Sequence, residues 1–79
     1  MISGRQIRAA RALLGWSGQE LADKCGISLK TFRRYEPQNG IPVGNTKVLE
    51  SIETVLEGHG IILTGDPVKD PGVILNQKD

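Results

Sequence analysis

The sequence predicts a mainly α-helical fold of four short helices followed by a C-terminal β-hairpin. Two capping boxes, Ser3 with Gln6 and Ser17 with Glu20, mark helix starts, because each hydroxyl can accept a hydrogen bond from the backbone amide three residues later. Apolar residues recur at helical spacing over most of the chain. After Gly60 the pattern changes to two short runs of consecutive aliphatic residues, which is typical of strands.

The length and composition indicate one globular domain. The chain has 79 residues, of which 38% are hydrophobic and 24% are charged, so a second independent core and a disordered chain are both excluded. No stretch approaches the roughly 18 consecutive apolar residues of a membrane span, and no apolar run follows the first arginines as in a signal peptide. We therefore expect a cytoplasmic protein with no membrane partner.

Each of the first three predicted helices begins after a serine. The first runs from Ser3 to Gly15, the second from Ser17 to Gly26, and the third follows Ser28. The apolar stripe of the first helix contains Ile7, Ala10, Leu13 and Leu14. The shared inner face of the next two contains Leu21, Ala22, Cys25, Ile27, Phe32 and Tyr35. Because these two helices are short and the turn between them is tight, they must cross steeply.

The fourth predicted helix starts at Asn45 or Thr46, after a loop over residues 37–45 that is rich in proline and glycine. Its apolar stripe contains Val48, Leu49, Ile52, Val55 and Leu56, and Glu50, Glu53 and Glu57 lie largely opposite. Residues 61–63 and 73–75 then form the two strands of the hairpin. We expect one face of the hairpin to pack against Ile52, Val55 and Leu56.

The two parts of the chain differ in charge. Up to Glu36 there are seven lysines and arginines against three acidic residues, and after it three against six, within an overall net charge of +1. Such an asymmetry points to an N-terminal part that faces a polyanion. A random distribution of surface charge is the plainer alternative.

The third predicted helix, about residues 28–36, carries the candidate site. Its outer face presents Leu29, Lys30, Thr31, Arg33 and Arg34. Lysine and arginine can donate to guanine O6 and N7, and leucine or threonine can touch a thymine methyl group, so this face fits the major groove of DNA. The alternative is a solvated basic face on a generic helical bundle.

Residues 2–58 resemble the helix-turn-helix domain of the Cro/phage-repressor type, also called lambda-repressor-like or Xre-type, which is found in many bacterial and phage regulators. The resemblance is carried by Gly15-Trp16-Ser17, Glu20-Leu21-Ala22, Gly26-Ile27-Ser28 and residues 32–36. It implies four of the five helices usual in that family, with the third as the recognition helix. We therefore expect a small transcriptional regulator that binds double-stranded DNA sequence-specifically.

The charges and the resemblance together assign roles to individual residues. Base readout is assigned to Leu29, Lys30, Thr31, Arg33 and Arg34. Phosphate contacts are assigned to Arg5, Arg8, Ser17, Gly18, Gln19, Lys24 and Ser28. Arg11 and Glu36 correspond to a structural arginine–glutamate pair of the family. Gly18 departs from the family, which commonly has a phosphate-contacting glutamine at this position.

No catalytic, cofactor or metal site is expected. One cysteine, Cys25, and one histidine, His59, cannot complete a structural zinc site, and no nucleophile–base set is present, so we expect no enzyme. The alternative function is a protein-interaction module, such as an antirepressor or cofactor-like adaptor, that does not read DNA. Gly18 and the acidic second half of the chain favour that alternative.

We expect residues 1–58 to bind DNA and residues 59–79 to form a hairpin and tail that hold a homodimer together. Consecutive aliphatic residues put apolar side chains on both faces of the hairpin at residues 60–76, and one face stays uncovered unless a second chain covers it. A two-fold dimer also suits half-sites about 34 Å apart. A hairpin that wraps around its own helices in a monomer is the alternative.

Overall fold

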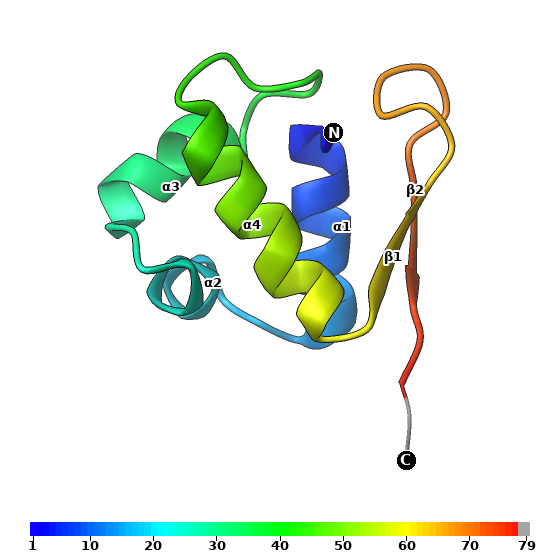
Figure 1. The fold of residues 1–79 in the computed structure, drawn as a ribbon, viewed down its shortest axis with the longest axis horizontal. Helices are drawn as coiled ribbons and strands as arrows, with labels where there is room; N and C mark the ends of the chain where they lie inside the picture. The colour runs from blue at the N-terminus through cyan, green and yellow to red at the C-terminus, as the bar shows by residue number, and fades with distance from the viewer. Residues whose placement is uncertain (78–79) are drawn as a thin grey trace.

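The computed structural model describes residues 1–77, which form four α-helices and one two-stranded antiparallel sheet (Figure 1). The helices are α1 (Gly4–Leu14), α2 (Gly18–Cys25), α3 (Leu29–Tyr35) and α4 (Thr46–Gly58), and the strands are β1 (Ile61–Thr64) and β2 (Gly72–Leu75). A mainly helical fold with a C-terminal hairpin is therefore confirmed. The last two residues of the predicted 59–79 unit, Lys78 and Asp79, lie outside the described residues.

Local side-chain motifs set the helix starts. Ser3 with Gln6 and Ser17 with Glu20 form complete capping boxes, in which side chain and backbone of each pair exchange hydrogen bonds. Asn45 caps α4 by accepting a hydrogen bond from a backbone amide two residues later. These bonds satisfy amides that the first turn of a helix leaves without an intrahelical partner.

The helix ends differ from one another. Gly15 and Gly26 follow α1 and α2 with φ of 71° and 70°, left-handed values that glycine adopts without steric cost. α3 has no such glycine, and its C-cap residue Glu36 keeps a right-handed helical conformation. Gln38 meets the end of α3 instead: its amide donates to the Tyr35 carbonyl at 3.2 Å and its Nε2 donates to the Arg34 carbonyl at 2.6 Å.

The core lies between the helices and the inner face of the hairpin. α2 packs on α3 and α4, β2 packs on α1, and β1 packs on α4. The buried apolar residues are Ile2, Ile7, Ala10, Leu21, Ala22, Phe32, Tyr35, Leu49, Ile52, Leu56 and Ile61. Leu13, expected in the stripe of α1, is instead 48% exposed, because the buried face follows Ile7, Ala10 and Leu14.

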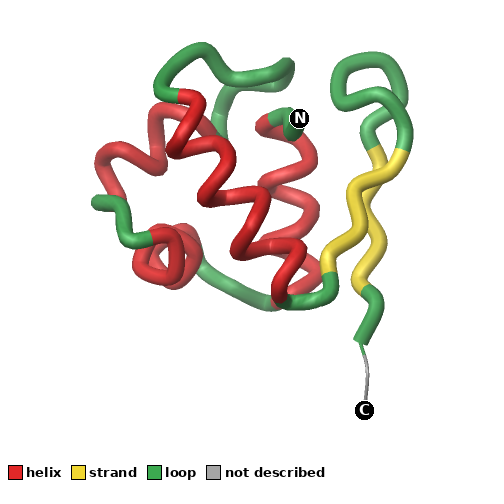
Figure 2. The backbone as a smooth tube through the Cα atoms, viewed as in Figure 1, coloured by secondary structure: helices red, strands yellow, loops and turns green. Residues whose placement is uncertain are grey.

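The hairpin forms the side of the molecule opposite α3 (Figures 1 and 2). Ile61 pairs with Leu75 and Ile62 with Ile74 across the two strands. Ile61 faces the core and is 2% exposed, whereas Ile62 and Ile74 face outward and are 45% and 51% exposed. The expected packing on α4 is only part of the contact, since α1 supports β2.

Candidate nucleic-acid interface

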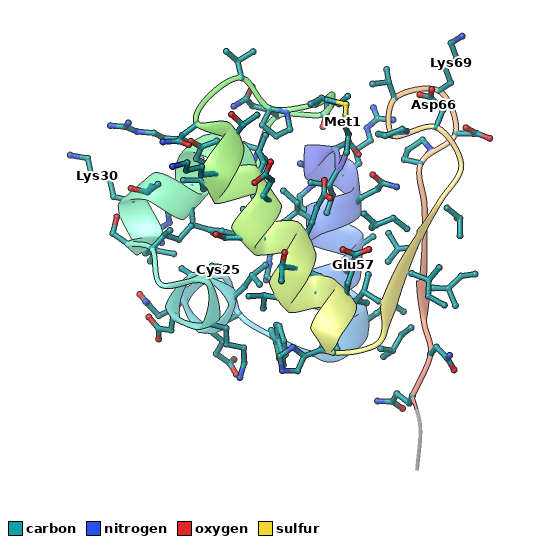
Figure 3. All side chains as sticks on the ribbon, in the orientation of Figure 1. Met1, Cys25, Lys30, Glu57, Asp66 and Lys69 are labelled. Carbon is teal, nitrogen blue, oxygen red and sulfur yellow. The ribbon has the colours of Figure 1, made fainter. Side chains whose placement is uncertain are left out.

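α3 exposes three cationic side chains on the side that faces away from the core. Phe32 is fully buried and Tyr35 is 5% exposed, which turns the opposite side of the helix to solvent. Lys30, Arg33 and Arg34 lie on that side and are exposed, and Lys30 extends away from the helices (Figure 3). Among residues 1–77, no ion pair engages these three side chains. Their positive charge is therefore available to an anion.

The other two predicted base readers, Leu29 and Thr31, are half-buried. Leu29 packs against the hydrophobic core. The Ser28 hydroxyl donates to Thr31 Oγ1 at 3.0 Å and accepts from the Thr31 amide at 3.1 Å, so the threonine hydroxyl already has a partner. The exposed cations are thus the groups of this set that lie open to a ligand.

The close packing of α2 on α3 accounts for Gly18. A Cβ atom there would lie 3.3 Å from Phe32 Cε2 and 3.7 Å from Leu29 Cδ1. The 3.3 Å contact is tight, so any side chain at this position requires the buried Phe32 ring to shift by a few tenths of an ångström. Any anion at the start of α2 would meet backbone amides at this position, because glycine has no side chain to offer.

The start of α2 already carries a negative charge. Ser17 Oγ accepts from the Glu20 amide at 3.1 Å, and the Ser17 amide donates to Glu20 Oε1 at 3.0 Å. These hydrogen bonds to Ser17 lower the pKa of the Glu20 carboxyl. The ionised carboxylate lies where the helix dipole also favours an anion, so it competes with a phosphate for this end of α2.

The remaining side chains predicted to contact phosphates have different surroundings. Arg5 is exposed, and no ion pair holds it in the described part of the chain. Lys24 Nζ lies 4.9 Å from the centroid of the Trp16 ring, in cation–π contact. Gln19 Nε2 donates to Asp23 Oδ1 at 2.7 Å. Arg5 is therefore the most open of these groups.

Arg8 and Arg11 reach from α1 to the end of α3. Arg11 donates to both carboxylate oxygens of Glu36, from Nε at 2.7 Å and from Nη2 at 3.2 Å, and also to the Trp16 carbonyl at 3.1 Å. Arg8 donates to the backbone carbonyl of Glu36 and, at 2.8 Å, to Asn39 Oδ1. The sequence does not predict the contact with Asn39 or this use of Arg8, because both depend on the path of the loop after α3.

Trp16 also links the α1–α2 turn to the end of α4. Its ring meets the His59 ring edge-on, with centroids 4.7 Å apart and planes at 81°. His59 Nδ1 lies 2.8 Å from the Val55 carbonyl oxygen. His59 is exposed, and its contact with Trp16 depends on where the end of α4 meets the α1–α2 turn.

Cys25 is half-buried on α2, beside residues of α4. Burial raises the pKa of its thiol to about 11. The sulfur is therefore a neutral thiol at ordinary pH, unsuited to act as a nucleophile or metal ligand there. No group of three or more His, Cys, Asp and Glu side chains in residues 1–77 is placed to hold a metal ion.

Two further observations bear on the class of protein. Within the described residues, none of the helices has the length and apolar character needed to cross a bilayer. A scan against protein-family models finds no match to the chain, and a search of curated proteins finds none with a similar sequence.

Proposed function

We propose that the protein is a transcriptional regulator that binds double-stranded DNA sequence-specifically through a lambda-repressor-like helix-turn-helix made of α2 and α3. The observation that carries this proposal is the outer face of α3, where Lys30, Arg33 and Arg34 are exposed. Within the described residues, no acidic side chain forms an ion pair with any of them. An α-helix fits the major groove, and arginine and lysine match the acceptors that guanine presents there.

The way α3 is held supports the same function. Base readout needs a helix that keeps a fixed orientation, and a free helix of seven residues does not keep its shape in water. Phe32 and Tyr35 anchor the inner face of α3, and Arg11 anchors its C-terminal end through Glu36. The cations therefore stand on a rigid support.

A gel shift with a pool of random 20-bp duplexes tests the proposal. We expect retention that weakens steeply as salt rises, because each neutralised phosphate contributes about 0.9 to the slope of log affinity against log salt. The variant Lys30→Ala/Arg34→Ala should lose retention. Its matched control is Lys47→Ala/Lys69→Ala, which removes the same charge from exposed positions on α4 and the hairpin loop and should retain the duplexes.

A protein-interaction module that does not read DNA is the second candidate. The Glu20 carboxylate at the start of α2 favours it, as does the engagement of Leu29 and Thr31 within the fold. This candidate predicts that the protein retains no duplex even at about 50 mM salt, where charge-driven binding is strong. That outcome would overturn the DNA-binding proposal.

We also propose that the hairpin joins two copies of the chain. Ile62 and Ile74 lie opposite each other and form an exposed apolar pair on the outer face of the sheet. A two-fold axis brings identical patches together, so an apolar face can cover itself in a dimer. The hairpin and α3 lie at opposite ends of the molecule (Figure 1), so a copy seated on the hairpin leaves α3 open to DNA.

A further inference from the structure

Three residues on one face of α1 contact the end of α3. Gly4, Arg8 and Arg11 stand at positions i, i+4 and i+7 of the helix. A Cβ atom at Gly4 would overlap the Gln38 carbonyl oxygen and lie 2.7 Å from that of Glu36, so the backbone after α3 is in direct contact with α1 there. The Gly4 amide also donates to the Gly40 carbonyl at 3.1 Å, which fastens the loop after α3 to the first turn of α1.

Arg8 bridges the end of α3 and this loop. One terminal nitrogen of its guanidinium donates to the Glu36 carbonyl, and the other donates to Asn39 Oδ1 at 2.8 Å. Because the guanidinium is planar and rigid, two bonds from it fix the direction of each donor and hold the two acceptors in one arrangement. The helix end and the loop are therefore held as a unit.

The Glu36 carbonyl takes its donor from α1 and not from the residues around it in sequence. α1 and α2 end at left-handed glycines whose amides turn back to the last carbonyls. Glu36 stays helical, and the end of α3 is met instead by Gln38, whose amide donates to the Tyr35 carbonyl at 3.2 Å and whose Nε2 donates to the Arg34 carbonyl at 2.6 Å. An arginine at a helix C-terminus also meets the negative end of the helix dipole. Arg8 thus adds, from α1, a donor to the Glu36 carbonyl, next to the carbonyls that Gln38 satisfies.

We propose that Arg8 is a positioning residue that fixes the orientation of α3, and that it is not the phosphate contact that its charge alone predicts. The proposal rests on the proposed function, in which α3 reads bases. A change in the tilt of a seven-residue helix moves Lys30, Arg33 and Arg34 relative to the base edges. Losing a phosphate contact would instead weaken all duplexes alike.

Two substitutions separate these roles. Arg8→Lys keeps the charge but loses the planar pair of donors, and Asn39→Ala removes one acceptor without changing any charge. The probe is a duplex that the wild-type protein selects from the random pool, together with its single-base variants. For both substitutions we expect discrimination between these duplexes to fall about tenfold, with the salt slope unchanged. The control Arg5→Ala should lower the salt slope by about one and leave discrimination unchanged.

A phosphate role for Arg8 makes the opposite prediction. Arg8→Lys and Asn39→Ala would then keep full discrimination, and Arg8→Ala would lower the salt slope by about one. That pattern would overturn the positioning role. Thermal unfolding of each variant checks that the protein compared on DNA is folded.

Amide hydrogen exchange without DNA gives an independent readout. The Gly4 amide, whose acceptor Gly40 lies in the loop that Arg8 holds, should exchange about tenfold faster in Arg8→Lys and Asn39→Ala than in the wild type. Arg5→Lys should leave its rate unchanged. Equal rates in all four proteins would overturn the proposal. If the wild type retains no duplex, the proposed function fails, and the exchange rates still decide whether Arg8 holds the end of α3.

Discussion

The side-chain amide of Gln6 in α1 donates a 3.0 Å hydrogen bond to the backbone carbonyl of Gly72 in β2, across 66 residues of sequence. The same nitrogen reaches the Thr64 carbonyl in β1 at 3.4 Å, and the amide oxygen accepts from the Ser3 amide at 3.1 Å. Gln6 is 2% exposed. One buried side chain therefore completes the cap of α1 and holds both strands of the hairpin against that helix.

Replacing Gln6 by leucine should lower the free energy of unfolding by about 1–3 kcal/mol, because the buried Ser3 amide and the partly buried Thr64 and Gly72 carbonyls lose a partner. Urea denaturation measures the difference. Gln19→Leu is the matched control, since Gln19 is exposed and makes one side-chain bond, and it should change stability by about 0.5 kcal/mol or less. Equal effects of the two substitutions would contradict the structural role of Gln6.

Arg34→Ala should weaken binding to a selected duplex by about 1–3 kcal/mol and relax the preference at one base pair. Arg34 is exposed on α3, and truncating it removes a guanidinium that can donate to both O6 and N7 of one guanine. Binding isotherms on the selected duplex and its single-base variants measure both effects. Unchanged affinity together with unchanged preference would show that α3 does not read bases through this residue.

Arg11 and Glu36 should be coupled in stability. Their side chains are 28% and 16% exposed, so removing one partner leaves a partly buried charge uncompensated. Each single change should lower the free energy of unfolding by about 2–4 kcal/mol. Removing both, as in Arg11→Met/Glu36→Gln, should cost less than the sum of the single changes by about 0.5 kcal/mol or more. A double-mutant cycle in thermal unfolding measures the coupling. Strictly additive effects would mean that the ion pair contributes nothing.

The wild-type protein should self-associate through the outer face of the hairpin. Because that face is small, we expect a weak dimer, observed by sedimentation at concentrations up to about 0.5 mM. Ile62→Asp/Ile74→Asp should sediment as a monomer throughout this range. Val68→Asp is the control, since Val68 is 56% exposed on the hairpin loop and lies outside the Ile62–Ile74 pair. A monomeric wild type at the highest concentration would contradict the dimer.

The Cys25 thiol should react slowly with iodoacetamide. Its pKa is raised to about 11 from an ordinary 9.0, so the reactive thiolate is about 100-fold scarcer at pH 8 than for a free cysteine. Since a raised pKa delays deprotonation, the rate should climb as pH rises toward 11. The same protein unfolded in urea should react about 100-fold faster at pH 8. Equal rates for folded and unfolded protein would show that the thiol is not shielded.

Features that depend on neighbours in sequence could be predicted, and features that depend on tertiary contacts could not. A capping box needs residues three apart, so the starts of α1 and α2 follow from the sequence. The second role of Gln6 depends on where β2 docks. Three consecutive aliphatic residues in a strand do not show which face turns inward, and the docking of β2 on α1 decides it.

The candidate site divides in the same way. Helical periodicity places Lys30, Arg33 and Arg34 opposite the buried Phe32, so their exposure follows from the sequence. The engagement of Leu29 depends on how closely α2 approaches α3. The contacts of Arg8 depend on a loop whose path no local pattern indicates. The roles of all these residues on DNA stay predictions.

The packing of β2 on α1 sets an order for folding during synthesis. A ribosome delivers Gly72 66 residues after Gln6, whereas α2 and α3 are adjacent in sequence and can contact each other early. We therefore expect the helices to assemble first and the hairpin to dock last. Until then the amide of Gln6 and the apolar side of α1 remain open to solvent and to chaperones. A chain truncated before β2 would leave the hairpin-facing side of α1 uncovered, and we expect a protease to cleave it faster than the full chain.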